Sequence, residues 1–72
     1  MTIHELNADQ LRQLKERYLC DLANDGHYAE TMEVNYDEPS YWDLSHADEL
    51  VPNEWLYKQW EGYTFTEEDF IN

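Results

Sequence analysis

Cysteine, basic side chains and long apolar runs are all scarce in this chain. Cys20 is the only cysteine, so no disulfide can form within the chain, and a lone thiol is typical of a reducing compartment. No apolar stretch approaches the roughly 20 residues that cross a bilayer. Residues 1–5 lack the basic start and apolar run of a signal peptide. We therefore expect a cytoplasmic protein that does not engage a membrane.

The motifs of common catalytic and metal sites are also missing. The chain has no glycine-rich phosphate loop, no His-Glu-x-x-His pair and no Asp-x-Asp-x-Asp-Gly calcium loop. Asp43, His46 and Glu49 lie at i, i+3 and i+6, but a chain with 17 acidic residues produces such spacing by chance. Cys20 has no recognisable base near it in the sequence, so we expect an inert thiol that is buried or half-buried. We predict no enzyme activity, no metal and no cofactor.

Negative charge is what the chain has in excess. Its net charge is −13, and residues 1–20 are neutral because three acidic and three basic residues balance there. Residues 21–72 contain fourteen carboxylates, and Lys58 is their only lysine or arginine. A small domain with so acidic a surface repels itself and repels nucleic acid. We therefore expect no direct nucleic-acid binding, and an extended cationic protein surface as the partner.

The basic residues near the start have acidic neighbours at helical spacing. The expected i+3 and i+4 pairs are Asp9–Arg12, Arg12–Glu16 and Arg17–Asp21. We expect these cations to be paired locally and not to form a nucleic-acid-binding patch.

Residues 8–24 carry the clearest helical pattern. Asn7 can cap this helix, and Gln10 completes an Asn-x-x-Gln variant of the capping box. Gly26 supplies a stop, because glycine tolerates the left-handed conformation that follows many helices. An apolar stripe at helical spacing is formed by Leu11, Leu14, Tyr18 and Leu22.

The middle of the chain has the period of a half-buried strand. Met32, Val34 and Tyr36 alternate with polar residues. A strand needs a partner, which is either residues 63–65 or a second molecule. Both alternatives stay open.

Short helical segments are expected after Pro39. Ser40 can cap a helix over residues 41–49, with Asp43 in the capping-box position. A second helix is expected over residues 54–61, and a last turn over residues 66–71 with Phe70 as its anchor. The whole chain, residues 1–72, is thus predicted to be one small, mainly α domain. A long first helix would pack against two or three short helices. Whether a two-stranded β ribbon is also present stays open.

Aromatic residues oppose the disorder that high charge and low hydropathy indicate. The chain has three Trp, six Tyr and two Phe, and each ring can bury about 150–250 Å². We expect Trp42, Trp60 and Phe70 in the core, and leave Tyr57 and Tyr63 open between core and surface. An exposed ring in an acidic field would serve as an interface anchor.

The acidic residues from Asp37 onward are scattered along the expected short helices and turns. Helical neighbours one turn apart lie about 5–6 Å from each other, and duplex DNA carries about one charge per 1.7 Å of its axis. This spacing predicts a partial imitation of DNA charge, although a solvated surface that only confers solubility is the alternative. The predicted partner-binding residues are Asp37, Glu38, Asp43, Asp48, Glu49, Glu54, Glu61, Glu67, Glu68 and Asp69.

Three stretches of the chain resemble short acidic proteins encoded by bacterial phages and mobile elements. They are residues 5–19, residues 45–51 and residues 65–70, about two fifths of the chain, and none carries a catalytic signature. In size and charge the chain is also similar to phage-encoded DNA-mimic inhibitors, including several anti-CRISPR proteins. The resemblance implies blockade of a cationic DNA-binding channel on a host defence complex such as a CRISPR-Cas effector, and it assigns no individual functional residue.

The sequence thus predicts a stoichiometric inhibitor, monomeric or homodimeric, that acts by charge mimicry. The alternative is an acidic interaction or assembly module that binds through an exposed aromatic patch, with charge serving mainly for solubility.

Overall fold

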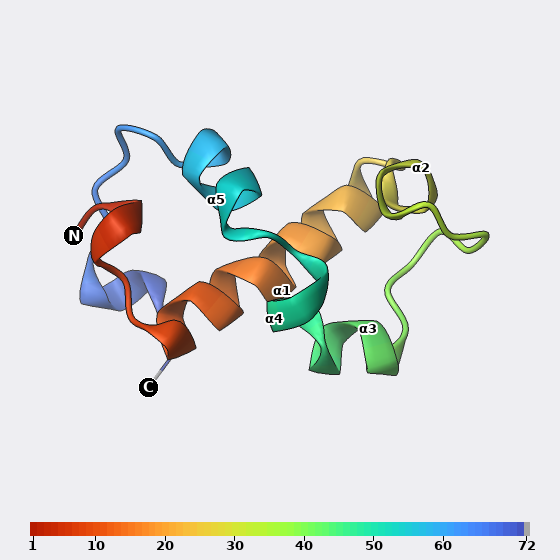
Figure 1. Ribbon diagram of the computed structural model, residues 1–72, viewed down its shortest axis with the longest axis horizontal. Coiled ribbons are helices and arrows are strands. Elements are labelled where there is room, and N and C mark those ends of the chain that lie inside the picture. Colours follow the sequence, from red (N-terminus) through yellow and green to blue (C-terminus); the bar gives the residue numbers. More distant parts are fainter. Residues whose placement is uncertain (72) are drawn as a thin grey trace.

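The protein is a small helical domain, shown by a computed structural model that describes residues 1–71 (Figure 1). No strand occurs among these residues, so the mainly α prediction is confirmed and the β ribbon is not seen. None of their helices is long and apolar enough to cross a bilayer. The elements in chain order are η1 (Ile3–Glu5), α1 (Ala8–Asn24), α2 (Tyr28–Met32), α3 (Tyr41–Ser45), α4 (Ala47–Leu50), α5 (Asn53–Gln59) and η2 (Glu67–Asp69).

Helix α1 crosses the middle of the molecule, and the other elements lie around it and beyond its ends (Figure 1). Its observed bounds are those predicted from the sequence. The capping box is present, because Gln10 N–H donates to Asn7 Oδ1 at 2.8 Å and Asn7 N–H donates to Gln10 Oε1 at 3.0 Å. Gly26 follows with φ +77°, the left-handed conformation that favours glycine.

Loss of the Asn7 cap is expected to destabilise the protein measurably. In an Asn7→Ala variant, the N–H of Gln10 loses its acceptor, so the free energy of unfolding should fall by about 1 kcal/mol. Urea unfolding followed by circular dichroism measures this. Asn7→Ser keeps a capping oxygen and should stay near the wild type, and equal losses in both variants would contradict a capping role.

The core lies along one side of α1. Leu14 and Leu19 of α1 are buried, whereas the predicted stripe residues Leu11, Tyr18 and Leu22 pack only at its edge. The apolar face is therefore rotated toward Leu19. The buried apolar residues are Ile3, Leu6, Leu14, Leu19, Tyr28, Ala47, Val51, Leu56, Phe65 and Phe70.

The strand predicted near residues 32–36 is wrong. Residues up to Met32 form α2, which ends where Glu33 takes a left-handed φ of +57°. The Val34 N–H then donates to the Ala29 carbonyl at 3.0 Å, so it closes the helix end and pairs with no strand.

The alternative strand partner, residues 63–65, does not form a strand either. Phe65 instead exchanges two backbone hydrogen bonds with Met1. The Met1 nitrogen donates to the Phe65 carbonyl at 2.9 Å, and the Phe65 N–H donates to the Met1 carbonyl at 2.6 Å. This pairing joins the first residues to the segment before η2.

The helix expected over residues 41–49 is present but divided. His46 has φ −110° and ψ 21°, which separates α3 from α4. Ser40 caps α3 as predicted, because its Oγ accepts from the Asp43 N–H at 3.1 Å. Helix α5 begins one residue earlier than expected and ends at Gln59, and η2 forms the predicted last turn beside buried Phe70.

Two predictions of burial are wrong. Trp42 is 58% exposed, and Cys20 is exposed as well. Phe70 is in the core as expected, and Trp60 packs against the core while partly exposed. Tyr63 lies on the surface, where 43% of it is exposed.

Candidate partner-binding surface

Apart from Asp43 in α3, the predicted carboxylates lie on four parts of the fold. They occupy the turn before α3, helix α4, the region of α5 and the final turn η2. Asp69 is half-buried, and its carboxylate accepts the Thr66 N–H at 2.9 Å in the capping box of η2. The exposed members are Asp37, Glu38, Asp48, Glu49, Glu54, Glu61, Glu67 and Glu68, which we call the acidic surface.

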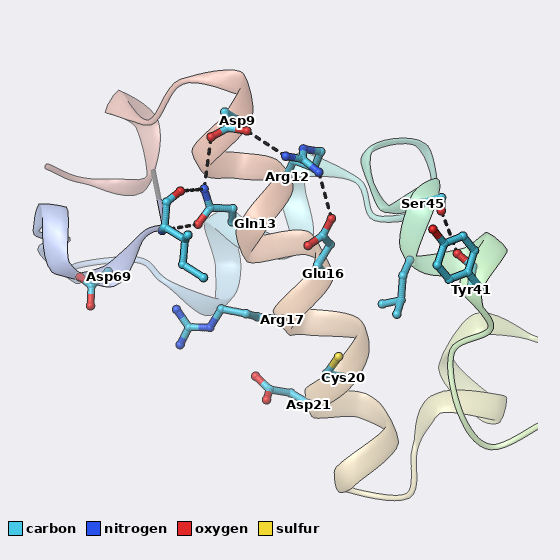
Figure 2. A pocket seen from close by; sticks show the side chains of 12 residues that line it. Asp9, Arg12, Gln13, Glu16, Arg17, Cys20, Asp21, Tyr41, Ser45 and Asp69 are labelled. Carbon is cyan, nitrogen blue, oxygen red and sulfur yellow. Dashed lines mark hydrogen bonds and ion pairs between the residues drawn. The ribbon is translucent and has the colours of Figure 1, made fainter.

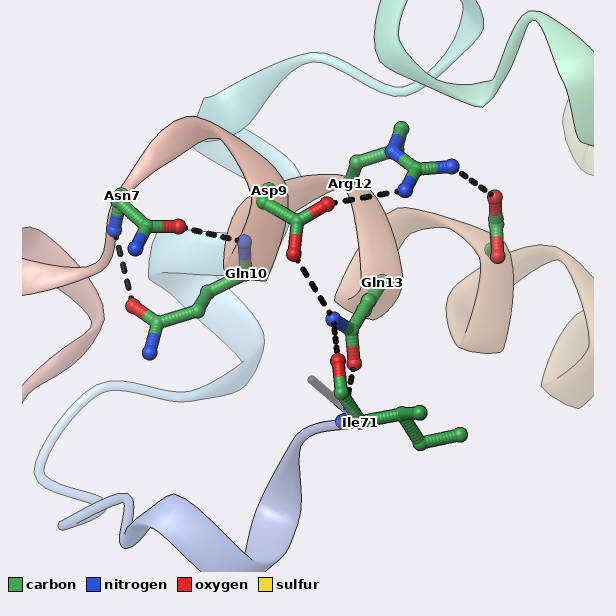
Figure 3. Close-up of polar contacts among 7 residues, drawn as sticks. Asn7, Asp9, Gln10, Arg12, Gln13 and Ile71 are labelled. Atoms are coloured by element: carbon green, nitrogen blue, oxygen red, sulfur yellow. Dashed lines mark hydrogen bonds and ion pairs between the residues drawn. The ribbon is translucent and has the colours of Figure 1, made fainter.

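No member of the acidic surface forms an ion pair within the described part of the chain. The ion pairs there are Asp9–Arg12 at 2.9 Å, Arg12–Glu16 at 3.2 Å and His27–Glu30 at 4.0 Å. The first two confirm the pairing predicted for Arg12 (Figure 3).

The other predicted pair, Arg17–Asp21, is not among the ion pairs of residues 1–71. The Arg17 guanidinium lies 5.9 Å from the centre of the Trp60 ring instead. Lys15 is buried, and its Nζ donates to the Asp48 backbone carbonyl at 3.1 Å. The structure therefore uses these cations for its own packing.

The charge is dense for the size of the body. The described chain measures 36 × 23 × 19 Å. A net charge of −13 along the longest dimension is about one charge per 3 Å, against about one per 1.7 Å for duplex DNA. The long dimension is also close to one turn of B-DNA, about 34–36 Å.

Asp43 is not part of this surface. Only 4% of it is exposed, and its Oδ2 accepts hydrogen bonds from Tyr28 Oη at 2.7 Å, Tyr36 Oη at 2.8 Å and Ser40 N at 3.1 Å. A carboxylate enclosed by three donors cannot contact a partner. We therefore remove Asp43 from the predicted binding residues and assign it to the fold.

The same hydrogen bonds set the ionisation of this cluster. Burial raises the pKa of Asp43, but the hydrogen bonds from Tyr28, Ser40 and Tyr36 outweigh burial and hold that pKa below its ordinary value. Burial and the bond to Asp43 raise the pKa of Tyr28, while the bond to Asp43, with burial, raises that of Tyr36. At neutral pH the cluster is one carboxylate held by two neutral phenols.

The Asp43 cluster is expected to lose its stabilising effect in acid. Because the folded pKa of Asp43 is depressed, its contribution is complete above the ordinary value of 3.8 and is lost as pH falls through the lower folded value. Urea unfolding of the wild type and of Asp43→Asn at pH 7, 4, 3 and 2 tests this. The difference in stability between the two proteins should shrink below about pH 4. A difference independent of pH would contradict the assigned ionisation.

A groove with a volume of about 820 Å³ follows the polar face of α1 (Figure 2). Tyr41 of α3 lies on one side of it and Asp69 on the other, and Ile71 is also part of its lining. Its lining includes both arginines of α1 and four carboxylates, so it carries both signs of charge. Cys20 also lines this groove, but in residues 1–71 no group of three His, Cys, Asp or Glu side chains is placed to hold a metal ion.

Gln13 lines this groove and binds the backbone of Ile71, a role not predicted from the sequence. Its Nε2 donates to the Ile71 carbonyl at 2.7 Å, and its Oε1 accepts the Ile71 N–H at 2.8 Å (Figure 3). These bonds attach the segment after η2 to α1. The contact joins residues 58 positions apart, so no local pattern could have indicated it.

No family model, curated protein or solved structure matches this chain. The likeness to phage-encoded inhibitors therefore stays a prediction from its residues and charge.

Proposed function

We propose that this protein is a phage-type inhibitor that imitates the charge of DNA and blocks the DNA-binding surface of a host defence complex, such as a CRISPR-Cas effector. The observation that supports this proposal is the acidic surface: eight exposed carboxylates, none of them in an ion pair within residues 1–71. Exposed carboxylates that form no ion pair of their own are available to an external cationic surface.

Inhibition follows from competition for the same cations. Carboxylates of the acidic surface would occupy lysine and arginine side chains that otherwise hold DNA phosphates. The charge per unit length is somewhat more than half that of duplex DNA. Attraction between such surfaces speeds association and is screened by salt. Binding would be stoichiometric, with no chemical step.

Affinity capture from a host lysate tests the proposal. The protein is immobilised, the lysate is applied at low salt, and bound material is eluted with rising salt. We expect recovery of a DNA- or guide-RNA-dependent defence complex that moderate salt releases and duplex DNA displaces. Recovery only of a salt-resistant partner that is indifferent to DNA would contradict charge mimicry.

Charge reversal on η2 is expected to weaken binding more than reversal elsewhere. Glu67→Lys with Glu68→Lys removes two exposed carboxylates and leaves the capping residue Asp69 in place. Affinity for the captured partner should fall by about tenfold or more, because two attractions become repulsions. Calorimetric titration measures the change.

The matched control carries the same change of net charge at the other end of the molecule. Asp25→Lys with Glu30→Lys alters two exposed carboxylates near α2, outside the acidic surface (Figure 1). Equal losses in both double variants would mean that overall charge, and not η2, governs the affinity.

A second candidate function is favoured by the exposed rings of α3. Tyr41 is 88% exposed and Trp42 is 58% exposed. In an interaction or assembly module, these rings would supply the affinity and the charge would supply solubility. Binding would then resist salt, and truncation of either ring would weaken it more than charge reversal on η2.

A further inference from the structure

Two large aromatic rings stand outside the core on the first turn of α3. Tyr41 and Trp42 are the most exposed aromatic residues among those described, and neither packs in the core. Neighbouring residues on a helix point roughly 100° apart, so the two rings offer two separate surfaces. In a chain with so small a core, leaving a tryptophan exposed forgoes apolar burial that would stabilise the fold. We call Tyr41 and Trp42 the aromatic turn.

Hydrogen bonds and packing within the domain fix the position of the aromatic turn. The Ser40 capping box fixes its backbone, and the buried Asp43 ties that box to Tyr28. The Trp42 ring stacks on His46, with centroids 4.1 Å apart and planes inclined by 17°. His46 Nδ1 also lies 2.8 Å from the Trp42 carbonyl. One face of the Trp42 ring is thus covered and ordered, while the other remains open to a partner.

Exposed carboxylates flank the aromatic turn on both sides in the chain, while Tyr41 also lines the groove of mixed charge that contains Arg12 and Arg17. The exposed pairs Asp37–Glu38 and Asp48–Glu49 flank α3 in the chain, and none of the four is in an ion pair within residues 1–71. The face of an aromatic ring attracts cations. Arginine suits such a site better than lysine, because its planar guanidinium stacks on a ring, is weakly hydrated and pairs with carboxylates through two parallel bonds.

The molecule already contains one contact of this type. The Arg17 guanidinium lies over the Trp60 ring at 5.9 Å. Trp60 is thereby occupied by a cation of the same chain, whereas Trp42 has only His46 stacked on one face.

We propose that Tyr41 and Trp42 stack on arginine side chains of the partner's DNA-binding surface, while the flanking carboxylates pair with the same guanidinium groups. This inference rests on the proposed function and adds a preference that charge mimicry alone does not give. An imitation of phosphates attracts arginine and lysine by charge alike, whereas an aromatic turn discriminates between them.

Two synthetic peptides of equal length and charge test the inference. One carries six arginines spaced by glycine and serine, and the other carries six lysines at the same positions. Calorimetric titration at low salt gives their affinities for the wild-type protein. We expect the arginine peptide to bind about five- to tenfold more tightly, as two partly exposed cation–ring contacts imply.

Leucine variants distinguish the effect of the ring faces on peptide binding from the effects of apolar surface area and of charge. Tyr41→Leu with Trp42→Leu keeps apolar side chains but removes both ring faces, so the preference for arginine should disappear, with a larger loss of affinity for the arginine peptide than for the lysine peptide. Tyr41→Leu alone, at the more exposed position, should reduce the preference in part. Tyr63→Leu is the matched control, because Tyr63 is an exposed ring in the segment between α5 and η2, which lies away from α3 (Figure 1), and it should retain the full preference. Circular dichroism checks that each variant is folded.

The possible results are distinct. Equal binding of the two peptides by the wild type, or a preference that survives loss of both rings, would contradict arginine stacking on Tyr41 and Trp42. Neither result would contradict charge mimicry. Failure to bind either peptide at low salt would overturn both proposals. A preference abolished only by the α3 variants would support the inference.

Discussion

Replacing Asp43 with alanine is expected to destabilise the folded protein by about 3 kcal/mol, because a buried phenol loses its acceptor and a charged hydrogen-bond network is broken. Tyr28 is 1% exposed and cannot turn to water, whereas Tyr36 is 40% exposed and can. A domain of this size has a total stability on the order of 5 kcal/mol. About 2 kcal/mol would remain, so the unfolded fraction at 37 °C should rise to a few per cent.

Urea unfolding followed by tryptophan fluorescence measures this effect. Glu38→Ala is the matched control, because it removes a nearby carboxylate that is exposed. Its stability should stay within about 0.5 kcal/mol of the wild type. A similar small effect for Asp43→Ala would mean that the three hydrogen bonds contribute little, and that the position of α3 relative to α2 depends on other contacts.

Added salt is expected to slow association with the cationic partner by about 100-fold while it stabilises the folded chain. Association steered by charge loses its advantage when the Debye length falls from about 30 Å to about 3 Å. Folding responds in the opposite direction, since the chain has a net charge of −13 and its two Arg12 ion pairs are exposed. Screening therefore relieves more repulsion than it removes attraction.

Stopped-flow association with the captured partner and urea unfolding, both at 0.01 and 1 M NaCl, measure the two responses. The Glu67→Lys, Glu68→Lys variant is the control: each change adds two units, so its net charge is −9. Both responses should be weaker in this variant. Association independent of salt would contradict charge mimicry, and a chain destabilised by salt would contradict net self-repulsion.

Contacts between close neighbours in the chain could be predicted from the sequence. The capping boxes at Asn7 and Ser40 link residues three apart, so their residue types alone indicate where α1 and α3 begin. The Arg12 ion pairs follow the same rule. The acidic surface was also predictable, because most charged side chains must remain in water.

Contacts between residues that are distant in the chain could not be predicted from the sequence. The alternation around Val34 has the period of a strand, but no strand forms there. Met32 belongs to helix α2, and the Tyr36 hydroxyl donates a hydrogen bond to Asp43. The burial of Asp43 depends on a phenol 15 residues away. The exposure of Trp42 was missed because α3 is five residues long, too short for its pattern to show which side faces the core.

The joining of the first and last parts of the chain has a consequence for how the protein is made. Phe65 and Phe70 complete the same core as Ile3, and backbone bonds link Met1 to Phe65 across 64 positions. A nascent chain on the ribosome can form the long first helix early but cannot close its core until these aromatic residues have emerged. The core therefore closes only after residues 65–70 have been made, and a chain truncated before Phe65 would lack both the backbone pairing with Met1 and two of its buried rings.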